Sequence, residues 1–136
     1  MRILLDTNVI LDVILARDPY VLSANKIIEM ICNDEVEAAV TASSITDIYY
    51  IVKKRLGDVT ARDAVRHILN IFNIINVDGA DCDYALNLPI SDFEDAVVVI
   101  CAKRGAIDYI VTNDKEFLQV TPKLARVISV DGFLAL

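Results

Sequence analysis

The sequence predicts an α/β fold in which a mostly parallel central sheet is covered by helices. Apolar runs of strand length occur at residues 2–5, 36–40, 74–77, 109–111 and 126–130, and longer segments with helical periodicity separate them. Strands that alternate with helices in this way are typical of parallel sheets. No repeat, low-complexity tract or Pro/Gly-rich linker interrupts the chain, so residues 1–136 are expected to form a single domain.

Two helices are predicted in the first half of the chain. Asp18 and Pro19 give an N-cap and a first helical position, and the residues that follow place an apolar face along 21–31. A second helix is expected to begin at Ser44 and to end at Gly57, a typical C-terminal glycine.

Two further helices are predicted in the second half. Thr60 with Asp63 is expected to cap a helix whose buried stripe comprises Val65, Ile68, Leu69 and Phe72. The segment "DFEDAVVVICAKRG" at 92–105 is apolar almost all round after its first turn, which is typical of a helix in the centre of a layer.

The composition provides enough hydrophobic residues for a packed core, and the protein is expected to be cytoplasmic. Hydrophobic residues make up 55% of the 136 residues. The longest strictly apolar run, residues 96–102, is far shorter than the ~20 residues that span a bilayer, so no membrane segment is expected. "MRILLD" is too short for the apolar part of a signal peptide. Cys32, Cys82 and Cys101 form no C-x-x-C pair and are expected to be reduced, buried thiols.

Four acidic residues lie at or near the predicted beginnings of helices: Asp6, Asp47, Asp95 and Asp114. Each has a structural explanation, because Asp and Ser cap helices and acids in a first turn favour the helix dipole. In a parallel sheet, however, helices that follow strands begin at the same carboxyl edge. First-turn acids from different crossovers are therefore expected to gather there.

Such a cluster of carboxylates needs cations. Two carboxylates 4 Å apart repel by about 4 kcal/mol at an effective dielectric of 20. Lys115 is the only basic residue next to the four acids, whereas hard divalent ions prefer oxygen ligands. Without these acids the formal charge falls from −7 to −3, and bound ions would let a polyanion approach. Candidate phosphate contacts are Lys53, Lys54, Arg55, Arg62, Arg66, Lys103, Arg104 and Lys115.

The four motifs together resemble the PIN domain family, and within it the VapC-type toxins. The segments are "LLDTNVILD", "SSITDIYYIVKK", "DFEDAVVVICAKRG" and "DYIVTNDKEF", which occur in the family's order and cover essentially the whole chain. The resemblance implies a three-layer α/β/α fold. It also implies a Mg²⁺- or Mn²⁺-dependent endoribonuclease that is the toxin of a type II toxin-antitoxin system.

Carried over by position, the resemblance implies that Asp6, Asp47, Asp95 and Asp114 hold the metal in a nuclease site. The supporting polar groups would be Thr7, Asn8, Thr112 and Asn113. Many relatives have Glu at the second position, and Asp47 is one methylene shorter, so it could bind through water. Asp12, Asp92 and Glu94 could join an outer shell, or be ordinary solvated helix positions.

Other functions have less support in the sequence. His67 is the sole histidine, and no G-x-S-x-G, Walker A or G-x-G-x-x-G motif occurs, which argues against a histidine-based triad and a zinc site. A non-catalytic RNA-binding or regulatory module of the same fold is one alternative. A receiver-like domain is another, although "RVISVDGF" lacks the lysine that it would need after the last strand.

The expected partners are an RNA substrate, a small antitoxin protein and a second copy of the chain. RNA and antitoxin are implied by the resemblance. The apolar helices at 21–31 and 45–56 could provide a homodimer face, although core packing explains most of their side chains.

Overall fold

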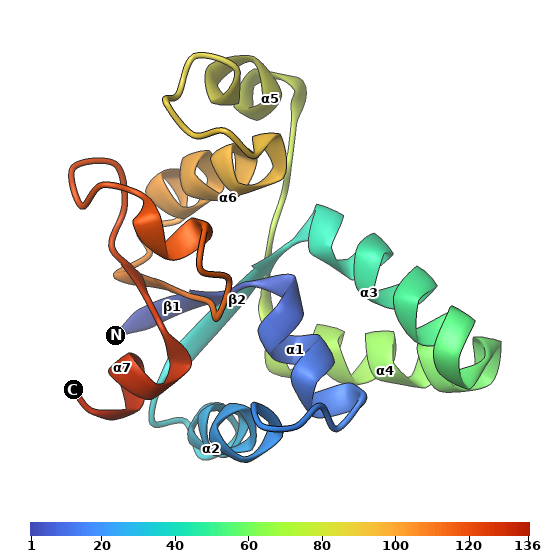
Figure 1. Cartoon of the computed structure of the whole chain (residues 1–136). Coiled ribbons are helices and arrows are strands. Elements are labelled where there is room, and N and C mark those ends of the chain that lie inside the picture. The colour runs from blue at the N-terminus through green and yellow to red at the C-terminus, as the bar shows by residue number, and fades with distance from the viewer.

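The computed structural model describes residues 1–136 and has three layers, with helices on both faces of a central sheet (Figure 1). Its strands are β1 (Arg2–Leu5), β2 (Glu37–Thr41), β3 (Asn73–Ile75), β4 (Tyr109–Val111) and β5 (Val127–Ile128). They lie in the order β3-β2-β1-β4-β5, and every neighbouring pair is parallel. The predicted α/β/α fold with a parallel sheet is confirmed.

β1 lies in the middle of the sheet and sets the position of its carboxyl edge. Ile3 is paired with Ala38 of β2 on one side and with Tyr109 of β4 on the other. Because the strand order runs outward in both directions from β1, the connections leave this edge on opposite sides, and a crevice opens between them. The chain reaches that crevice at the residue after Leu5.

The helices are α1 (Thr7–Ile14), α2 (Val21–Cys32), α3 (Ala42–Leu56), α4 (Asp58–Ile71), α5 (Gly79–Ala85), α6 (Phe93–Arg104), the 3₁₀ helix η1 (Phe117–Gln119) and α7 (Val130–Leu134). α1, α2, α4 and α7 pack on one face of the sheet, and α5, α6 and η1 pack on the other. α3 and α4 pack against each other and project together from the body of the molecule (Figure 1).

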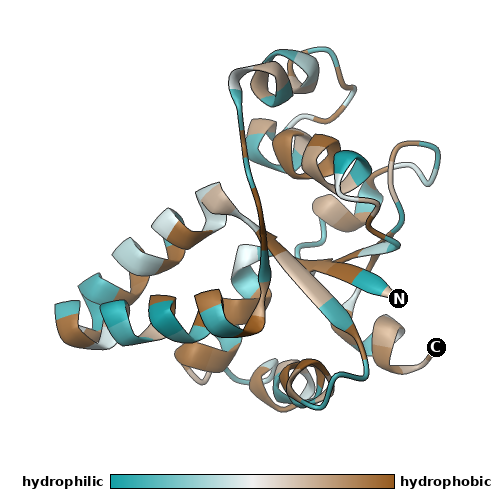
Figure 2. Ribbon diagram, turned by 180° about the vertical axis from the view of Figure 1, so that it is seen from behind, coloured by the Kyte–Doolittle hydropathy of each residue, from teal (hydrophilic) through white to brown (hydrophobic).

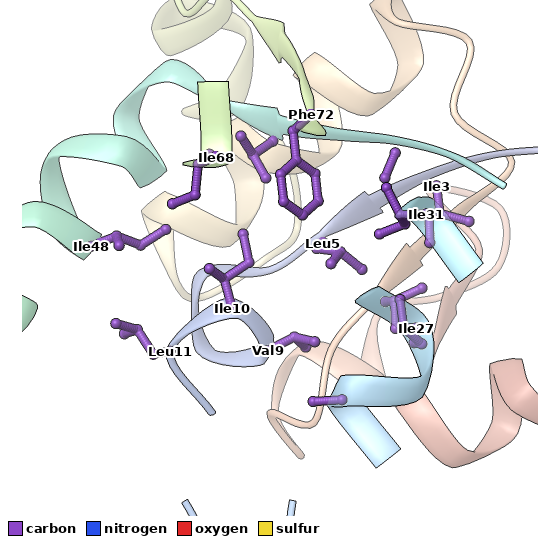
Figure 3. Packing of buried hydrophobic residues seen from close by; sticks show 14 of the residues in the cluster. Ile3, Leu5, Val9, Ile10, Leu11, Ile27, Ile31, Ile48, Ile68 and Phe72 are labelled. Atoms are coloured by element: carbon purple, nitrogen blue, oxygen red, sulfur yellow. The ribbon is translucent and has the colours of Figure 1, made fainter. Parts of the chain in front are cut away.

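Side chains that alternate along the strands belong to two hydrophobic clusters, one on each face of the sheet. Ile3 and Leu5 of β1 point into the larger cluster, with α1, α2 and α4 (Figure 3). Leu4, between them, belongs to the second cluster, under α6. Hydrophobic residues are dense along the strands and in α6, whereas α3 and α4 mix hydrophobic and hydrophilic positions (Figure 2). The central place predicted for the 92–105 helix is confirmed.

The predicted start of α2 at Asp18 and Pro19 is wrong. The helix begins at Val21, and the residue before it provides no side-chain cap. Asp18 and Pro19 lie instead in a turn that is closed when the N–H groups of Tyr20 and Val21 donate to the Arg17 carbonyl, at 3.0 and 2.8 Å. The backbone therefore satisfies these donors without the Asp18 carboxylate.

The predicted start of α3 at Ser44 is also wrong. The helix begins at Ala42, and the Thr41 hydroxyl accepts a 3.3 Å hydrogen bond from the Ser44 N–H. Because Thr41 ends β2 and is itself a good N-cap, the chain passes from strand to helix without a loop. Ser44 therefore lies in the first turn, and no capping box forms between it and Asp47.

The start and the buried face of α4 differ from the prediction as well. The helix begins at Asp58, directly after Gly57, and Thr60 does not cap it. Gly57 has a φ of 91°, a backbone conformation that favours glycine and lets α3 turn sharply into α4. Ile68 is buried as predicted, but Leu69 is 53% exposed because the projecting helix pair leaves that side uncovered.

The last segment and the cysteines show two further differences. Val130, predicted to end a strand, begins α7, which Ser129 caps. All three cysteines are free, but only Cys101 is buried; Cys82 is half-buried and Cys32 is exposed at the end of α2. No helix combines the length and the hydropathy needed to cross a bilayer.

Candidate metal-binding active site

A cavity of about 400 Å³ opens at the carboxyl edge of the sheet. It lies where α1, α3 and α6 begin and where the chain leaves β4. The residues that line it are Asp6, Thr7, Asn8, Asp47, Tyr50, Ile51, Asp92, Glu94, Asp95 and Asp114. The four acids predicted from the sequence thus lie around one cavity.

Asp6 is fixed at the innermost side of this cavity. It directly follows β1 and is the N-cap of α1, and its carboxylate accepts the Thr7 N–H at 2.9 Å and the Thr112 hydroxyl at 2.8 Å. Burial raises the pKa of Asp6, the two hydrogen bonds lower it, and the charges of Asp114 and Asp92 raise it further. The side chain is therefore held in one orientation by groups that favour its ionised form, in surroundings that oppose it.

Asp114 is oriented by the same threonine. Its backbone N–H donates to the Thr112 hydroxyl at 3.0 Å, and its carboxylate accepts the N–H groups of Glu116 and Phe117, at 2.9 and 3.4 Å. Asp114 thus shapes the turn before η1, and one carboxylate oxygen takes both of these hydrogen bonds. Thr112 joins the end of β4 to the end of β1.

Asp95 lies in the first turn of α6. Its N–H donates to the Asp92 carboxylate at 2.9 Å, so Asp92 caps the helix that carries Asp95. Burial, followed by repulsion from Asp92, Asp6, Asp114 and Glu94, raises the pKa of Asp95 to about 7. A carboxyl group with this pKa exchanges its proton near neutral pH.

Asp47 and Glu94 face each other across the cavity mouth. Asp47 is exposed on the second turn of α3, and Glu94 extends from the first turn of α6. A hydrogen bond with the Asp47 carboxyl, then burial and the charges of Asp47, Asp92 and Asp6, raise the pKa of Glu94 to about 7. A Glu94 carboxyl that keeps its proton up to near neutral pH reduces the repulsion from the neighbouring carboxylates when no cation lies between them.

The predicted supporting groups occupy different positions. Thr7 and Asn8, in the first turn of α1, line the cavity itself. Thr112 is buried behind it and reaches it through Asp6. The Asn113 side chain is directed elsewhere, since its oxygen accepts the Val130 N–H at 3.3 Å and so connects the end of β4 to α7.

Two lining residues, Tyr50 and Ile51, were not singled out from the sequence. They follow Asp47 by three and four positions, the spacing that places side chains on one face of a helix, and this spacing could have identified them. The sequence predicts Asp92 and Glu94 either as outer-shell groups or as solvated helix positions. Both in fact line the cavity.

The donor groups of the cavity suit a hard divalent ion. Six of the ten lining residues carry carboxylates, and none is Lys, Arg, His or Cys. The structure contains no group of three or more His, Cys, Asp or Glu side chains already arranged around one ion position. Mg²⁺ fits an open site of this kind, because it is usually bound by one or two carboxylates and keeps several waters.

The basic residues lie outside this cavity. Arg104, at the far end of α6, pairs with the buried Asp81 of α5, with 2.6 Å between Nη2 and Oδ2. Arg62 and Arg66 instead line a separate groove between α3 and α4. Arg104 is thus engaged in an ion pair with a buried acid, whereas Arg62 and Arg66 are exposed on the projecting helix pair.

Known proteins with sequence or fold similarity are consistent with this geometry. Ribonuclease VapC1 of Aquifex aeolicus (strain VF5) is 25% identical over 121 residues, which are 85% of this chain and 83% of that protein. VapC20, a sarcin-ricin loop cleaving toxin of Mycobacterium tuberculosis, superposes with a TM-score of 0.69 at 15% identity, over 85% of this chain and 92% of that chain.

A toxin-antitoxin complex from Klebsiella pneumoniae gives a TM-score of 0.68 at 19% identity, over 93% of this chain and 96% of that chain. At these identities the solved structures show a shared fold. The PIN domain family model matches residues 2–116, from β1 to the turn after Asp114, and therefore includes all four predicted acids. The chain belongs to the PIN domain family.

Proposed function

We propose that this PIN-domain protein is an endoribonuclease that uses Mg²⁺ or Mn²⁺ to hydrolyse RNA phosphodiester bonds. The observation that carries the proposal is the cavity at the carboxyl edge of the sheet, which is lined by six carboxylates and by no basic side chain. The similarity to a protein named as a ribonuclease, over 85% of the chain, supports the choice of RNA.

The proposed metal ligands are Asp6, Asp95 and Asp114, with Asp47 bound directly or through water. When bound, a divalent ion supplies the Lewis acidity that makes a water nucleophilic at neutral pH and stabilises charge on the leaving oxygen. Thr112 bonds to the Asp6 carboxylate and to the Asp114 backbone N–H, so it holds these two residues in a fixed relation at the cavity.

The acids at the cavity mouth can also handle protons. The raised pKa of Glu94, about 7, lets this side chain gain or lose a proton near neutral pH. The Asp92 carboxylate fixes the first turn of α6 and so holds both Glu94 and Asp95 at the cavity. No side chain here is required as a covalent nucleophile.

The biological setting that we propose is the toxin half of a toxin-antitoxin pair in the cytoplasm. Support comes from the fold shared with a toxin-antitoxin complex and with a toxin that cleaves the sarcin-ricin loop. The partner would be a small antitoxin protein. A homodimer remains a prediction, which sedimentation at micromolar concentration tests directly.

The deciding experiment is cleavage of a mixed single-stranded RNA pool with Mg²⁺ or Mn²⁺. Two controls accompany it: the wild type with EDTA, and Asp6→Asn purified identically. We expect cleavage by the wild type with metal and none in either control. Equal cleavage by wild type and Asp6→Asn would contradict the proposal and favour a non-catalytic RNA-binding module of the same fold.

A further inference from the structure

One aromatic residue, Tyr50, stands at the rim of the acidic cavity. It is the only aromatic residue among those that line the cavity, and it is 63% exposed. It lies one helical turn after Asp47 on α3, so its ring is next to the carboxylates. Core packing does not explain a tyrosine that is this exposed.

The Tyr50 ring is supported from behind. The Tyr49 ring meets it edge to face, with centroids 5.0 Å apart and planes at 82°. Tyr49 is in turn fixed to α4, because its hydroxyl donates to the Asp58 carboxylate and the Arg62 guanidinium lies 5.6 Å from its ring centroid. Tyr50 therefore presents an exposed aromatic surface in a defined position beside the cavity.

A second tyrosine shows what an exposed ring without these features looks like. Tyr84 on α5 is also 63% exposed, but it lines none of the cavities described above. It has no aromatic neighbour of the kind that supports Tyr50. Exposure alone thus does not distinguish Tyr50, whereas its place at the cavity and its support do.

Beyond Tyr49 lies the groove between α3 and α4. Its volume is about 430 Å³, and it is lined by Ala42, Ile45, Thr46, Tyr49, Arg62, Val65 and Arg66. Arg62 and Arg66 pair with Asp58 and Asp63 at 2.9 and 2.8 Å, and the arginine side chains are 61% and 68% exposed. Exposed ion pairs of this kind contribute little to stability, so both guanidinium groups are available to a phosphate.

From this arrangement, and resting on the ribonuclease function above, we infer that Tyr50 is a stacking platform for a nucleobase next to the scissile phosphodiester. The strand then continues past Tyr49 into the α3–α4 groove, where Arg62 and Arg66 contact its phosphates. The substrate is single-stranded RNA, since only an unstacked base offers a free face to an aromatic side chain. This path also explains how a protein with a net charge of −7 binds a polyanion.

Binding, rather than cleavage, tests this inference. The probe is a dye-labelled single-stranded oligoribonucleotide of mixed sequence, bound to full-length Asp6→Asn protein with Mg²⁺ and followed by fluorescence anisotropy. Tyr50→Ala in this background should weaken binding about 5- to 150-fold, because stacking contributes roughly 1–3 kcal/mol per base and 1.4 kcal/mol is ten-fold. Tyr50→Phe should bind like the parent, because the ring does the stacking.

Two matched controls accompany these variants. Tyr84→Ala removes an equally exposed tyrosine and should leave RNA affinity unchanged. Arg66→Ala should reduce the dependence of log Kd on log salt by about one phosphate contact, whereas Arg126→Ala, at an exposed position before β5 and outside the groove, should not. A fully paired RNA duplex should bind more weakly, and its affinity should be the same for the parent and for Tyr50→Ala.

The inference is overturned if Tyr50→Ala binds single-stranded RNA as tightly as its parent, or if Tyr50→Phe is as weak as Tyr50→Ala. Failure of the ribonuclease proposal would look different. In that case the wild type would not cleave RNA with either metal, while the Tyr50 effect on binding would still be measurable. Conversely, if the wild type cleaves RNA with metal but Tyr50→Ala binds RNA as tightly as its parent, the ribonuclease proposal is supported and the stacking platform is overturned.

Discussion

Thr112 connects the ends of two neighbouring strands by donating a 2.8 Å hydrogen bond to Asp6 while its oxygen accepts the Asp114 N–H at 3.0 Å. It is fully buried and has no contact with the cavity of its own. Its role is to hold two proposed metal ligands in a fixed relation, which makes it a positioning residue.

Replacing this hydroxyl with a methyl group should therefore affect both stability and activity. Thr112→Val keeps the shape of the side chain but leaves the Asp114 N–H without its partner, which should lower the free energy of unfolding by about 1–3 kcal/mol. Loss of such outer groups typically reduces metal affinity or activity about 10–100-fold. Urea denaturation and the Mg²⁺ dependence of cleavage measure the two effects. Thr121→Val, at an exposed position, is the control and should change neither.

Glu94 provides a test of whether the cavity mouth takes part in metal binding. Glu94→Gln removes one carboxylate from the lining of the cavity, so the Mg²⁺ concentration for half-maximal cleavage should rise about ten-fold. Glu29→Gln, on the exposed side of α2, makes the same change of charge far from the cavity. An unchanged Mg²⁺ requirement in Glu94→Gln would show that this acid is only a solvated helix residue.

The raised pKa values of Asp95 and Glu94, both about 7, predict how pH acts on the metal-free protein. An unfolded carboxyl has a pKa near 4, so between about pH 4 and pH 7 the folded state holds protons that the unfolded state has released. Stability should therefore fall as pH rises through this window. Thermal melts in EDTA from pH 5 to pH 8 measure this decline.

Metal should reverse that decline. Because the ligands must lose their protons, Mg²⁺ should bind more tightly and raise the melting temperature more at pH 8 than at pH 5, and binding near pH 7 should release protons. Asp95→Asn should flatten the pH dependence in EDTA. A melting temperature that rises steadily with pH in EDTA would contradict the assigned shifts.

Neighbouring residues of α4 should respond very differently to truncation. Ile68 is 4% exposed in the core, whereas Leu69 is 53% exposed on the projecting side of the helix. Ile68→Ala should lower the free energy of unfolding by about 2–5 kcal/mol, and Leu69→Ala by less than about 0.5 kcal/mol. Chemical denaturation of the two variants compares them directly. Similar losses would mean that another surface, such as a second copy of the chain, covers Leu69 in solution.

Much of the fold could be predicted because it depends on local patterns. Buried parallel strands are short apolar runs, and the α6 segment is apolar nearly all round, so hydropathy identified both. Helix starts were less predictable, because several nearby groups can accept the free N–H groups of a first turn. Thr41 caps α3 in place of Ser44, and the Arg17 carbonyl accepts the N–H groups before α2 in place of the Asp18 side chain. Only the folded structure shows which hydrogen-bond donor pairs with which acceptor.

The sequence by itself determined that three of the four acids meet, because strand-to-helix connections place Asp6, Asp47 and Asp114 at the same edge of a parallel sheet. Only the tertiary structure brought Asp95 to that edge, since α5 and the turn after it must first fold back over α6. It likewise decided that Glu94 lies against Asp47 and that Tyr50 is supported by Tyr49 and α4. These relations depend on the packing of helices distant in sequence, which the periodicity of any one helix does not encode.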